Sequence, residues 1–403
     1  PGPQARMNPS PCDPARDEAP RRVLPLLGAA VTAGFEAGAI GYVLPAMRAG
    51  TGASAQDASW LLSVFVAATL VSVPLAALAT RRWGAARLLR GCLLLAVVSG
   101  GLASLLPSLG GVMAARALQG FAHGPLLPLA AAVVVMHWPA HQHGRLLGQV
   151  SMAYGLSYVA ATIGTPWLLE LGWRSAFTLV ACLALFSLAG PLPAVAAPQQ
   201  AHQAAAPWWL AFSRPMAAVV LLALGTGVGQ SVLVWMPTLA SVRLGVSMTA
   251  TAPLMIPLLL GGLCSTALVI RSLDHLGARP LVFIGMSAAL AGLLLVVAAP
   301  AGPRFFMAGG AALGFGIGLL SGGPLRYAAA RALQRDAQGL AQGAVAWLTD
   351  VGLLTGSLLL GYVAGRGNDG LSAIESALTL AGALMLLCAP AVLRLPRQAR
   401  IAA

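Results

Sequence analysis

Four ionisable side chains lie within long apolar stretches of this sequence, where a charge is costly. Glu36 lies in GFEAGAIGYVLPAM, Arg116 and His123 lie in RALQGFAHG, and Asp350 lies in AVAWLTDVGLLTG. Ionisable groups in a hydrocarbon environment mark proton relays, ion pathways or substrate sites. The chemistry that these residues predict is therefore proton loading and release, or the binding of a charged solute.

The carboxyl group of Glu36 can exchange a proton as its access to water changes, or it can pair with a cationic substrate. Arg116 and His123 are seven residues apart, which places them on one helix face. Because histidine changes charge near neutral pH, His123 is a candidate proton relay beside Arg116. We predict a proton-coupling site of Glu36, Arg116 and His123. A structural ion pair at Glu36 and a simple hydrogen bond at His123 are the alternatives.

Asp350 is the other acid deep in an apolar stretch, and two roles are open for it: contact with substrate or protons, and packing or gating. Side chains with an apolar body and a polar tip are typical of ligand cavities. The predicted substrate cavity is lined by Glu36, Tyr154, Tyr158, Gln230, Trp235, Trp347 and Asp350.

The elements that must position these residues are membrane-spanning helices. Hydrophobic residues make up 58% of the chain, charged residues 9%, and the mean hydropathy is +0.82. A soluble protein has about a quarter charged residues. The apolar runs are long enough to cross about 30 Å of hydrocarbon as helices. We predict twelve of them, at 23–47, 58–79, 88–107, 111–136, 146–168, 175–196, 215–241, 249–270, 280–300, 304–325, 339–364 and 371–393.

The net charge of +13 does not indicate a nucleic-acid-binding protein. All 24 basic residues are arginines, and they lie singly or in pairs between the apolar runs rather than in a basic domain or stripe. With the N-terminus inside, eighteen arginines fall on cytoplasmic segments and five on outer loops, while one lies within a run. This asymmetry follows the positive-inside rule. We expect a multi-pass protein of a bacterial inner membrane with both termini in the cytoplasm.

The two halves of the sequence repeat short patterns at a nearly constant distance. The pairs Pro45 and Pro237, Gly84 and Gly277, and Gly120 and Gly314 are separated by 192, 193 and 194 residues. Two related six-helix halves with a substrate site between them are a known transporter design. We predict an all-α integral membrane protein of 12 transmembrane helices in two pseudo-symmetric six-helix bundles. Its parts are a disordered cytoplasmic tail (1–22), an N-terminal bundle (23–196), a cytoplasmic linker (197–214), a C-terminal bundle (215–394) and a cytoplasmic tail (395–403).

An enzyme is not predicted. The sequence contains no phosphate-binding loop, no nucleophile motif and no segment that could form a soluble catalytic domain. No metal site is expected, because His141 and His143 lack further ligands nearby. We expect no cofactor, with a proton gradient as the energy source.

Several short patterns match the motifs of one family. The loop RRWGAAR and its second copy LDHLGAR are similar to the pattern Gly-x-x-x-Asp-Arg-x-Gly-Arg, although Arg81 stands at the place of the aspartate. RALQGFAHG is similar to a fourth-helix pattern, Arg-x-x-x-Gly, and the fifth run to a glycine- and proline-containing antiporter motif. The chain thus resembles the major facilitator superfamily, in particular its twelve-helix, drug:proton antiporter-like branch. The matching residues are Arg82, Gly84, Arg116, Gly120, Gly155, Gly164, Pro166, Asp274, Gly277 and Arg279.

The resemblance implies alternating access between two rocking halves, with the loop motif as a conformational latch and Arg116 in proton coupling. It favours proton-coupled efflux of a small amphipathic or cationic compound. The expected partners are the small-molecule substrate, protons and membrane lipids, without nucleic acid, and we expect a monomer. Uptake of a small organic anion, metabolite or siderophore, with Arg116 as the anion's partner, is the first alternative. A transport-inactive receptor or scaffold is the second.

Overall fold

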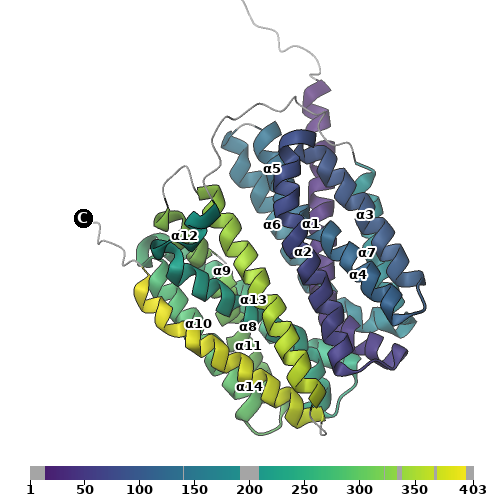
Figure 1. The fold of residues 1–403 in the computed structure, drawn as a ribbon, viewed down its shortest axis with the longest axis vertical. Coiled ribbons are helices and arrows are strands. Elements are labelled where there is room, and N and C mark those ends of the chain that lie inside the picture. Colours follow the sequence, from purple (N-terminus) through teal and green to yellow (C-terminus); the bar gives the residue numbers. More distant parts are fainter. Residues whose placement is uncertain are drawn as a thin grey trace, which may run out of the picture.

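The computed structural model describes residues 14–138, 140–190, 208–321, 323–333, 338–366 and 370–395. Within these ranges every regular element is a helix. Figure 1 shows the helices of the two chain halves as two bundles, side by side. The α-helices are α1 (Pro14–Thr51), α2 (Ala55–Trp83), α3 (Ala85–Leu105), α4 (Leu109–His123), α5 (Leu126–His137), α6 (Ala140–Leu168), α7 (Arg174–Leu188), α8 (Ala217–Leu244), α9 (Met248–Leu276), α10 (Ala278–Ala298), α11 (Pro303–Ser321), α12 (Gly323–Ala332), α13 (Gln338–Arg366) and α14 (Gly370–Cys388).

The twelve predicted runs correspond to these helices. Eleven helical stretches of the described chain are long and apolar enough to span a membrane, and α7 is a shorter apolar helix in the sixth run. Short 3-10 helices follow or precede the spans at Leu169–Leu171, Trp208–Phe212, Arg214–Met216 and Ala389–Arg394. The prediction of an all-α membrane fold is confirmed.

Three boundaries differ from the predicted ones. The fourth run is divided into α4 and α5 at Gly124 and Pro125, because proline cannot donate the backbone hydrogen bond that would continue the helix. The tenth run continues as α12 to Ala332. The tail predicted to be disordered is helical from Pro14, since proline is favoured at a first helical position and the alanine, arginine and glutamate that follow are good helix formers.

The other predicted tail and linker segments are only partly described. Residues 1–13, most of the linker (197–207) and residues 396–403 lie outside the described ranges. The end of the linker forms two of the short 3-10 helices.

The internal repeat is visible in the backbone. Ser54 caps the N-terminus of α2 and Ser247 that of α9, each accepting a hydrogen bond from the backbone N–H three residues on. Gly84 joins α2 to α3 and Gly277 joins α9 to α10, with φ angles of 79° and 76°. Glycine adopts such positive φ values readily, whereas a residue with a Cβ is strained there. Two pairs of equivalent positions thus build the same helix–turn–helix unit in each half.

Glycines also set the closest helix approaches in both halves. A Cβ on Gly120 of α4 would overlap the carbonyl oxygen of Phe65 in α2, and a Cβ on Gly314 of α11 would overlap that of Leu258 in α9. These two contacts are equivalent under the repeat. The sequence match between GFAHG and GFGIG therefore marks one packing contact that occurs twice.

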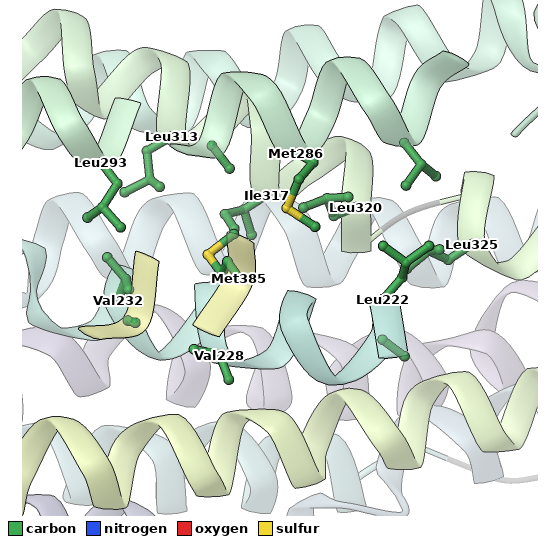
Figure 2. Close-up of a cluster of buried hydrophobic side chains, with 14 of the residues drawn as sticks. Leu222, Val228, Val232, Met286, Leu293, Leu313, Ile317, Leu320, Leu325 and Met385 are labelled. Atoms are coloured by element: carbon green, nitrogen blue, oxygen red, sulfur yellow. The ribbon is translucent and has the colours of Figure 1, made fainter. Parts of the chain in front are cut away.

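Each bundle has its own apolar core. Figure 2 shows the core of the C-terminal bundle, where side chains from α8, α10, α11, α12 and α14 point toward one another. The labelled residues are Leu222, Val228, Val232, Met286, Leu293, Leu313, Ile317, Leu320, Leu325 and Met385. The N-terminal bundle has two clusters, one of which includes Leu89, Leu126 and Val133 and the other Phe35, Leu61 and Phe177.

The two bundles meet mainly along α2 and α13, which lie side by side in Figure 1, with further contacts between α1 and α8 and between α6 and α9. Ser59 of α2 donates a hydrogen bond to the carbonyl of Ser357 in α13, and the Ser63 and Ser357 hydroxyls are 3.1 Å apart. These contacts lie near the end where α1 stops and α2 begins, which we name the outer end from the predicted orientation. A Cβ on Gly361 would overlap Ser59. The bundles are therefore in close contact along α2 and α13 at the outer end.

Candidate functional site

Glu36 and Arg116 form a buried ion pair inside the N-terminal bundle. Arg116 Nη1 of α4 donates to Glu36 Oε1 of α1. Their side chains are 1% (Arg116) and 7% (Glu36) exposed, which means that both charges are removed from solvent. The sequence placed these residues in different apolar runs, and the structure brings them into direct contact.

Gln119 connects this pair to His123. Its side-chain oxygen accepts from Arg116 Nη1 at 2.7 Å, and its Nε2 donates to Glu36 Oε2 at 3.2 Å. The backbone carbonyl of Gln119 lies 2.8 Å from His123 Nδ1. Because a carbonyl can only accept, the Nδ1 of His123 carries the proton and its Nε2 is the free acceptor. That Nε2 has no hydrogen-bond partner among the described residues.

Two aromatic rings cover the remaining guanidinium surface. The Arg116 Cζ atom lies 4.4 Å from the ring centre of Phe65 in α2 and 5.7 Å from that of Phe177 in α7. Nε and Nη2 of Arg116 make no hydrogen bond to any described residue. A cation–π contact of this kind is worth about 2 kcal/mol or more when it is desolvated. The Arg116 guanidinium therefore contacts the Glu36 carboxylate, the Gln119 side-chain amide and the rings of Phe65 and Phe177.

Close helix packing positions this cluster. Gly120 lets α4 approach α2 at Phe65, the residue whose ring covers Arg116. On the other side, Gly34 and Gly38 of α1 pack against backbone carbonyls of α6, which leaves no room for a Cβ at either position. The helix carrying Glu36 is thus fixed between its neighbours. The cluster is therefore a buried polar site held between closely packed helices.

The C-terminal bundle has no copy of this site. Under the repeat, Val228 takes the place of Glu36, Gly310 that of Arg116, and Ile317 that of His123. All three are buried in the apolar part of that bundle. The same helical scaffold therefore forms without the ion pair.

A second group of predicted residues lies at the boundary between the bundles. Trp347, Asp350 and Leu354 form one stripe along α13, since residues three and four apart share a helix face. Trp347 Nε1 donates to the carbonyl of Leu70 in α2 at 3.0 Å, and Leu354 packs against the N-terminal core. Asp350, between them, thus faces the N-terminal bundle.

Tyr154 and Tyr158 of α6 lie one helical turn apart in the N-terminal bundle. Tyr154 is within electrostatic range of both Tyr158 and Asp350. Tyr158 also packs against the core of the C-terminal bundle, and its hydroxyl interacts electrostatically with that of Tyr42 in α1. We refer to Tyr154, Tyr158 and Asp350 as the boundary group. Its members are half-buried and lie far from the helix ends.

Two predicted cavity residues, Gln230 and Trp235, belong to α8. Gln230 Nε2 donates to the Ser321 hydroxyl at 3.0 Å and so links α8 to α11 within one bundle. Trp235 lines a groove between α1 and α8 together with Pro45 and Arg48. The packing of Gly227 on Thr349 and of Gly356 on Ser231 shows that α8 and α13 run in parallel register. Along the common direction of the two helices, Trp235 of α8 lies about ten residues beyond the level of Asp350 in α13. This corresponds to about 15 Å along a helix.

The predicted motif residues have different surroundings. Gly84 and Gly277 make the turns described above, and Arg82 is exposed while Arg279 is half-buried. The side chain of Asp274 lies outside what the structure describes. A Cβ on Gly155 or Gly164 of α6 would meet open space. Pro166 lies inside α6, two residues before its end.

Sequence reasoning missed Gln119 and Phe65. Gln119 follows Arg116 by three residues in RALQG, a spacing that places both on one helix face, so this signal was available. Phe65 lies in a run of apolar residues with no distinguishing pattern. Only the helix packing shows that its ring covers a charge.

Comparison with known proteins identifies the family. A sequence model of the Major Facilitator Superfamily matches residues 26–273. The multidrug export protein EmrB of Haemophilus influenzae is 27% identical over 133 residues, which are 32% of this chain and 26% of that protein. A probable 4-methylmuconolactone transporter of Cupriavidus pinatubonensis is 25% identical over 267 residues, or 62% of each chain. The matches thus span about a quarter of the exporter and less than two thirds of the other relative.

Solved structures share the fold at low sequence identity. The nucleoside transporter NupG has a TM-score of 0.73 at 14% identity, covering 93% of this chain and 98% of that one. A D-xylose-proton symporter has a TM-score of 0.74 at 16% identity, covering 94% and 98%. Identities this low show a common fold and no more. With the sequence match over more than half of its length, the chain is a multi-pass membrane transporter that belongs to the Major Facilitator Superfamily.

Proposed function

We propose that this transporter exports a small amphipathic or cationic compound in exchange for protons, across a bacterial inner membrane. Glu36 is the group that takes up and releases the proton. Arg116 and Gln119 hold its charged form, and His123 is the relay through its free Nε2. The energy source is the proton gradient, without a cofactor.

The observation that supports this proposal is the buried Glu36–Arg116 ion pair. Removing two charges from water is expensive, and a buried pair is seldom more stable than apolar residues of similar volume. The C-terminal bundle forms the equivalent part of its fold with Val228 and Gly310. The pair is therefore not required by the scaffold. Intramembrane charges that the fold does not need are the ones expected to serve transport.

Protonation of Glu36 offers a way to bias the conformation. A neutral Glu36 carboxyl group no longer attracts Arg116 as an ion. The Arg116 guanidinium then keeps its contacts with the Gln119 side chain and the ring of Phe65. The link between α1 and α4 weakens, while the link between α4 and α2 stays. A ligand shifts a conformational equilibrium by its difference in affinity for the two states, and here the ligand is the proton.

Export of an amphipathic compound is supported by the similarity to EmrB, which is named as a multidrug export protein. Movement of an organic metabolite is the second candidate, favoured by the longer match to a probable 4-methylmuconolactone transporter. The version in which Arg116 binds an anionic substrate has less support, because Arg116 is 1% exposed and already paired with Glu36.

The test is transport in proteoliposomes under an imposed pH gradient. A panel of amphipathic compounds, positively charged and neutral, is screened for proton movement that depends on the compound, using a pH-sensitive dye inside the vesicles. For a compound added outside the vesicles, exchange carries protons out of the lumen as the compound enters, whereas uptake with protons carries them in. We expect exchange, and we expect Glu36→Gln to abolish it.

Glu170→Gln is the matched control, because Glu170 is an exposed acid just beyond α6. It should transport as the unmodified protein does. Full proton-coupled transport by Glu36→Gln would refute the role of Glu36. Proton movement in the same direction as the substrate would refute export by exchange.

A further inference from the structure

Three exposed arginines surround the turn between α2 and α3. Arg82 lies in the last turn of α2, and Arg87 and Arg90 lie in the first two turns of α3. None of the three side chains makes a hydrogen bond, an ion pair or a ring contact with any residue that the structure describes. Trp83, beside Arg82 in the chain, is 54% exposed. We refer to Arg82, Arg87 and Arg90 as the basic patch.

The basic patch continues into an apolar face of α3. Leu94 and Val98 are 57% and 49% exposed, and their spacing from Arg87 and Arg90 places all four side chains on one side of the helix. α3 packs on α4, α5 and α7 of its own bundle and lies on the side away from the C-terminal bundle (Figure 1). An exposed apolar helix face in a membrane protein contacts lipid tails, which are as apolar as leucine. Arg87 and Arg90 therefore lie at the head of a lipid-facing stripe.

The equivalent helix of the C-terminal bundle, α10, has neutral residues at the matching positions. With the repeat distance of 193 residues, Pro280 takes the place of Arg87 and Phe283 that of Arg90, and both are exposed. The same distance matches buried positions of the two helices, Leu89 with Val282 and Leu93 with Met286. Because six spans separate the two turns, both lie on the same side of the membrane, and the positive-inside rule applies to them alike. Neither the scaffold nor topology therefore explains why α3 carries two arginines on its lipid-facing stripe.

The chemistry of the basic patch fits a phosphate group that is joined to an acyl chain. Guanidinium groups bind phosphate oxygens through charge-assisted hydrogen bonds, and arginine is well suited to this geometry. Indole rings such as that of Trp83 are favoured at the level of the lipid head groups. A soluble anion would use the arginines and leave the apolar face of α3 without a role. A phospholipid with net negative charge uses both.

We propose that Arg82, Arg87 and Arg90 bind the head-group phosphate of an anionic phospholipid, and that one acyl chain of this lipid lies along Leu94 and Val98. With the predicted orientation, the α2–α3 turn is cytoplasmic, so the lipid belongs to the inner leaflet. The site is separate from the cluster of Glu36 and Arg116, and it depends neither on the substrate nor on the direction of transport.

The experiment compares two lipids with the same acyl chains and different head-group charge. The purified, delipidated full chain in detergent is titrated with phosphatidylglycerol or with zwitterionic phosphatidylcholine, and native mass spectrometry counts the bound lipids. We expect phosphatidylglycerol to bind at least about tenfold more tightly, because each basic side chain near a membrane surface raises the affinity for anionic lipid about fivefold. The double variant Arg87→Gln/Arg90→Gln should lose this preference. Arg90→Phe, which introduces the residue found at the equivalent place in α10, should bind phosphatidylglycerol about fivefold more weakly.

Arg271→Gln/Arg326→Gln is the matched control, because it removes the same charge from two exposed arginines at the same end of the C-terminal bundle. It should bind phosphatidylglycerol as the unmodified protein does, within about twofold. An equal loss in this control would show attraction to the overall charge and overturn the site. Equal binding of the two lipids, or unchanged binding by Arg87→Gln/Arg90→Gln, would overturn it as well.

Two further measurements complete the test. Inorganic phosphate at millimolar concentration should not displace phosphatidylglycerol, and displacement would overturn the assignment to a lipid. The thermal unfolding midpoint in detergent without lipid should be the same for all variants, because the substituted arginines are exposed and unpaired among the described residues. If the double glutamine variant unfolds, Arg90→Phe carries the test alone, and unchanged binding of phosphatidylglycerol by this variant would overturn the site.

Discussion

The energetic coupling between Glu36 and Arg116 can be measured by a double-mutant cycle. Arg116→Leu removes the ion pair, the bond to Gln119 and the contact with Phe65, which leaves the Glu36 carboxylate buried with one amide donor 3.2 Å away. Breaking a buried pair by removing one partner costs about 3–5 kcal/mol. Glu36→Gln is milder, because Arg116 keeps the 2.7 Å bond to Gln119 and both rings.

The double variant should be less unstable than the sum of its parts. With both charges gone, no buried charge is left without a partner, and the expected coupling free energy is at least about 2 kcal/mol. The unfolding free energies of Arg116→Leu, Glu36→Gln and the double variant can be obtained at neutral pH by titration with SDS in mixed micelles. Tryptophan fluorescence monitors the unfolding. Additive effects, within about 0.5 kcal/mol, would refute the view that these charges stabilise one another.

Arg243 and Glu375 provide a matched control in the same molecule. They form an ion pair at 2.7 Å near the outer end, with side chains 9% and 29% exposed. Because water reaches this pair, the same cycle should give a coupling of about 1 kcal/mol or less. Salt should weaken it, whereas the Glu36–Arg116 coupling should hardly change. Equal couplings and equal salt dependence for the two pairs would contradict the role given to burial.

Two further predictions concern glycines at helix contacts. Gly120→Ala should destabilise the protein by about 1–3 kcal/mol in the same titration, because its Cβ would overlap the Phe65 carbonyl. The control Gly155→Ala places its Cβ in open space and should be neutral or slightly stabilising. Equal effects of the two substitutions on the unfolding free energy would contradict the packing. Gly361→Val should separate α13 from α2 at Ser59 and weaken closure of the outer end. In a background without native cysteines, a Ser63→Cys reporter should then react faster with a membrane-impermeant thiol reagent added outside, and an unchanged rate would show that this contact does not hold the outer end closed.

Much of the fold could be predicted from the sequence because it follows from local composition. Runs of about twenty apolar residues have one stable arrangement in lipid, a helix that satisfies its own backbone hydrogen bonds. Gly84 and Gly277 indicated equivalent turns, and GFAHG and GFGIG indicated equivalent packing, because glycine is needed wherever a backbone turns or approaches closely. The break after His123 was missed, although the Gly-Pro pair that causes it is plain in the sequence.

The sequence by itself also determined which residues are candidates for a functional site, since a charge in an apolar run is conspicuous whatever its surroundings. Only the tertiary structure decided their partners. Glu36 and Arg116 are eighty residues apart, and no local pattern shows that one neutralises the other. Likewise, nothing near Trp347 in the chain shows that its indole N–H donates to the carbonyl of Leu70 in the other bundle. Pairing is set by how the helices rotate and pack, and that depends on contacts distributed over the whole chain.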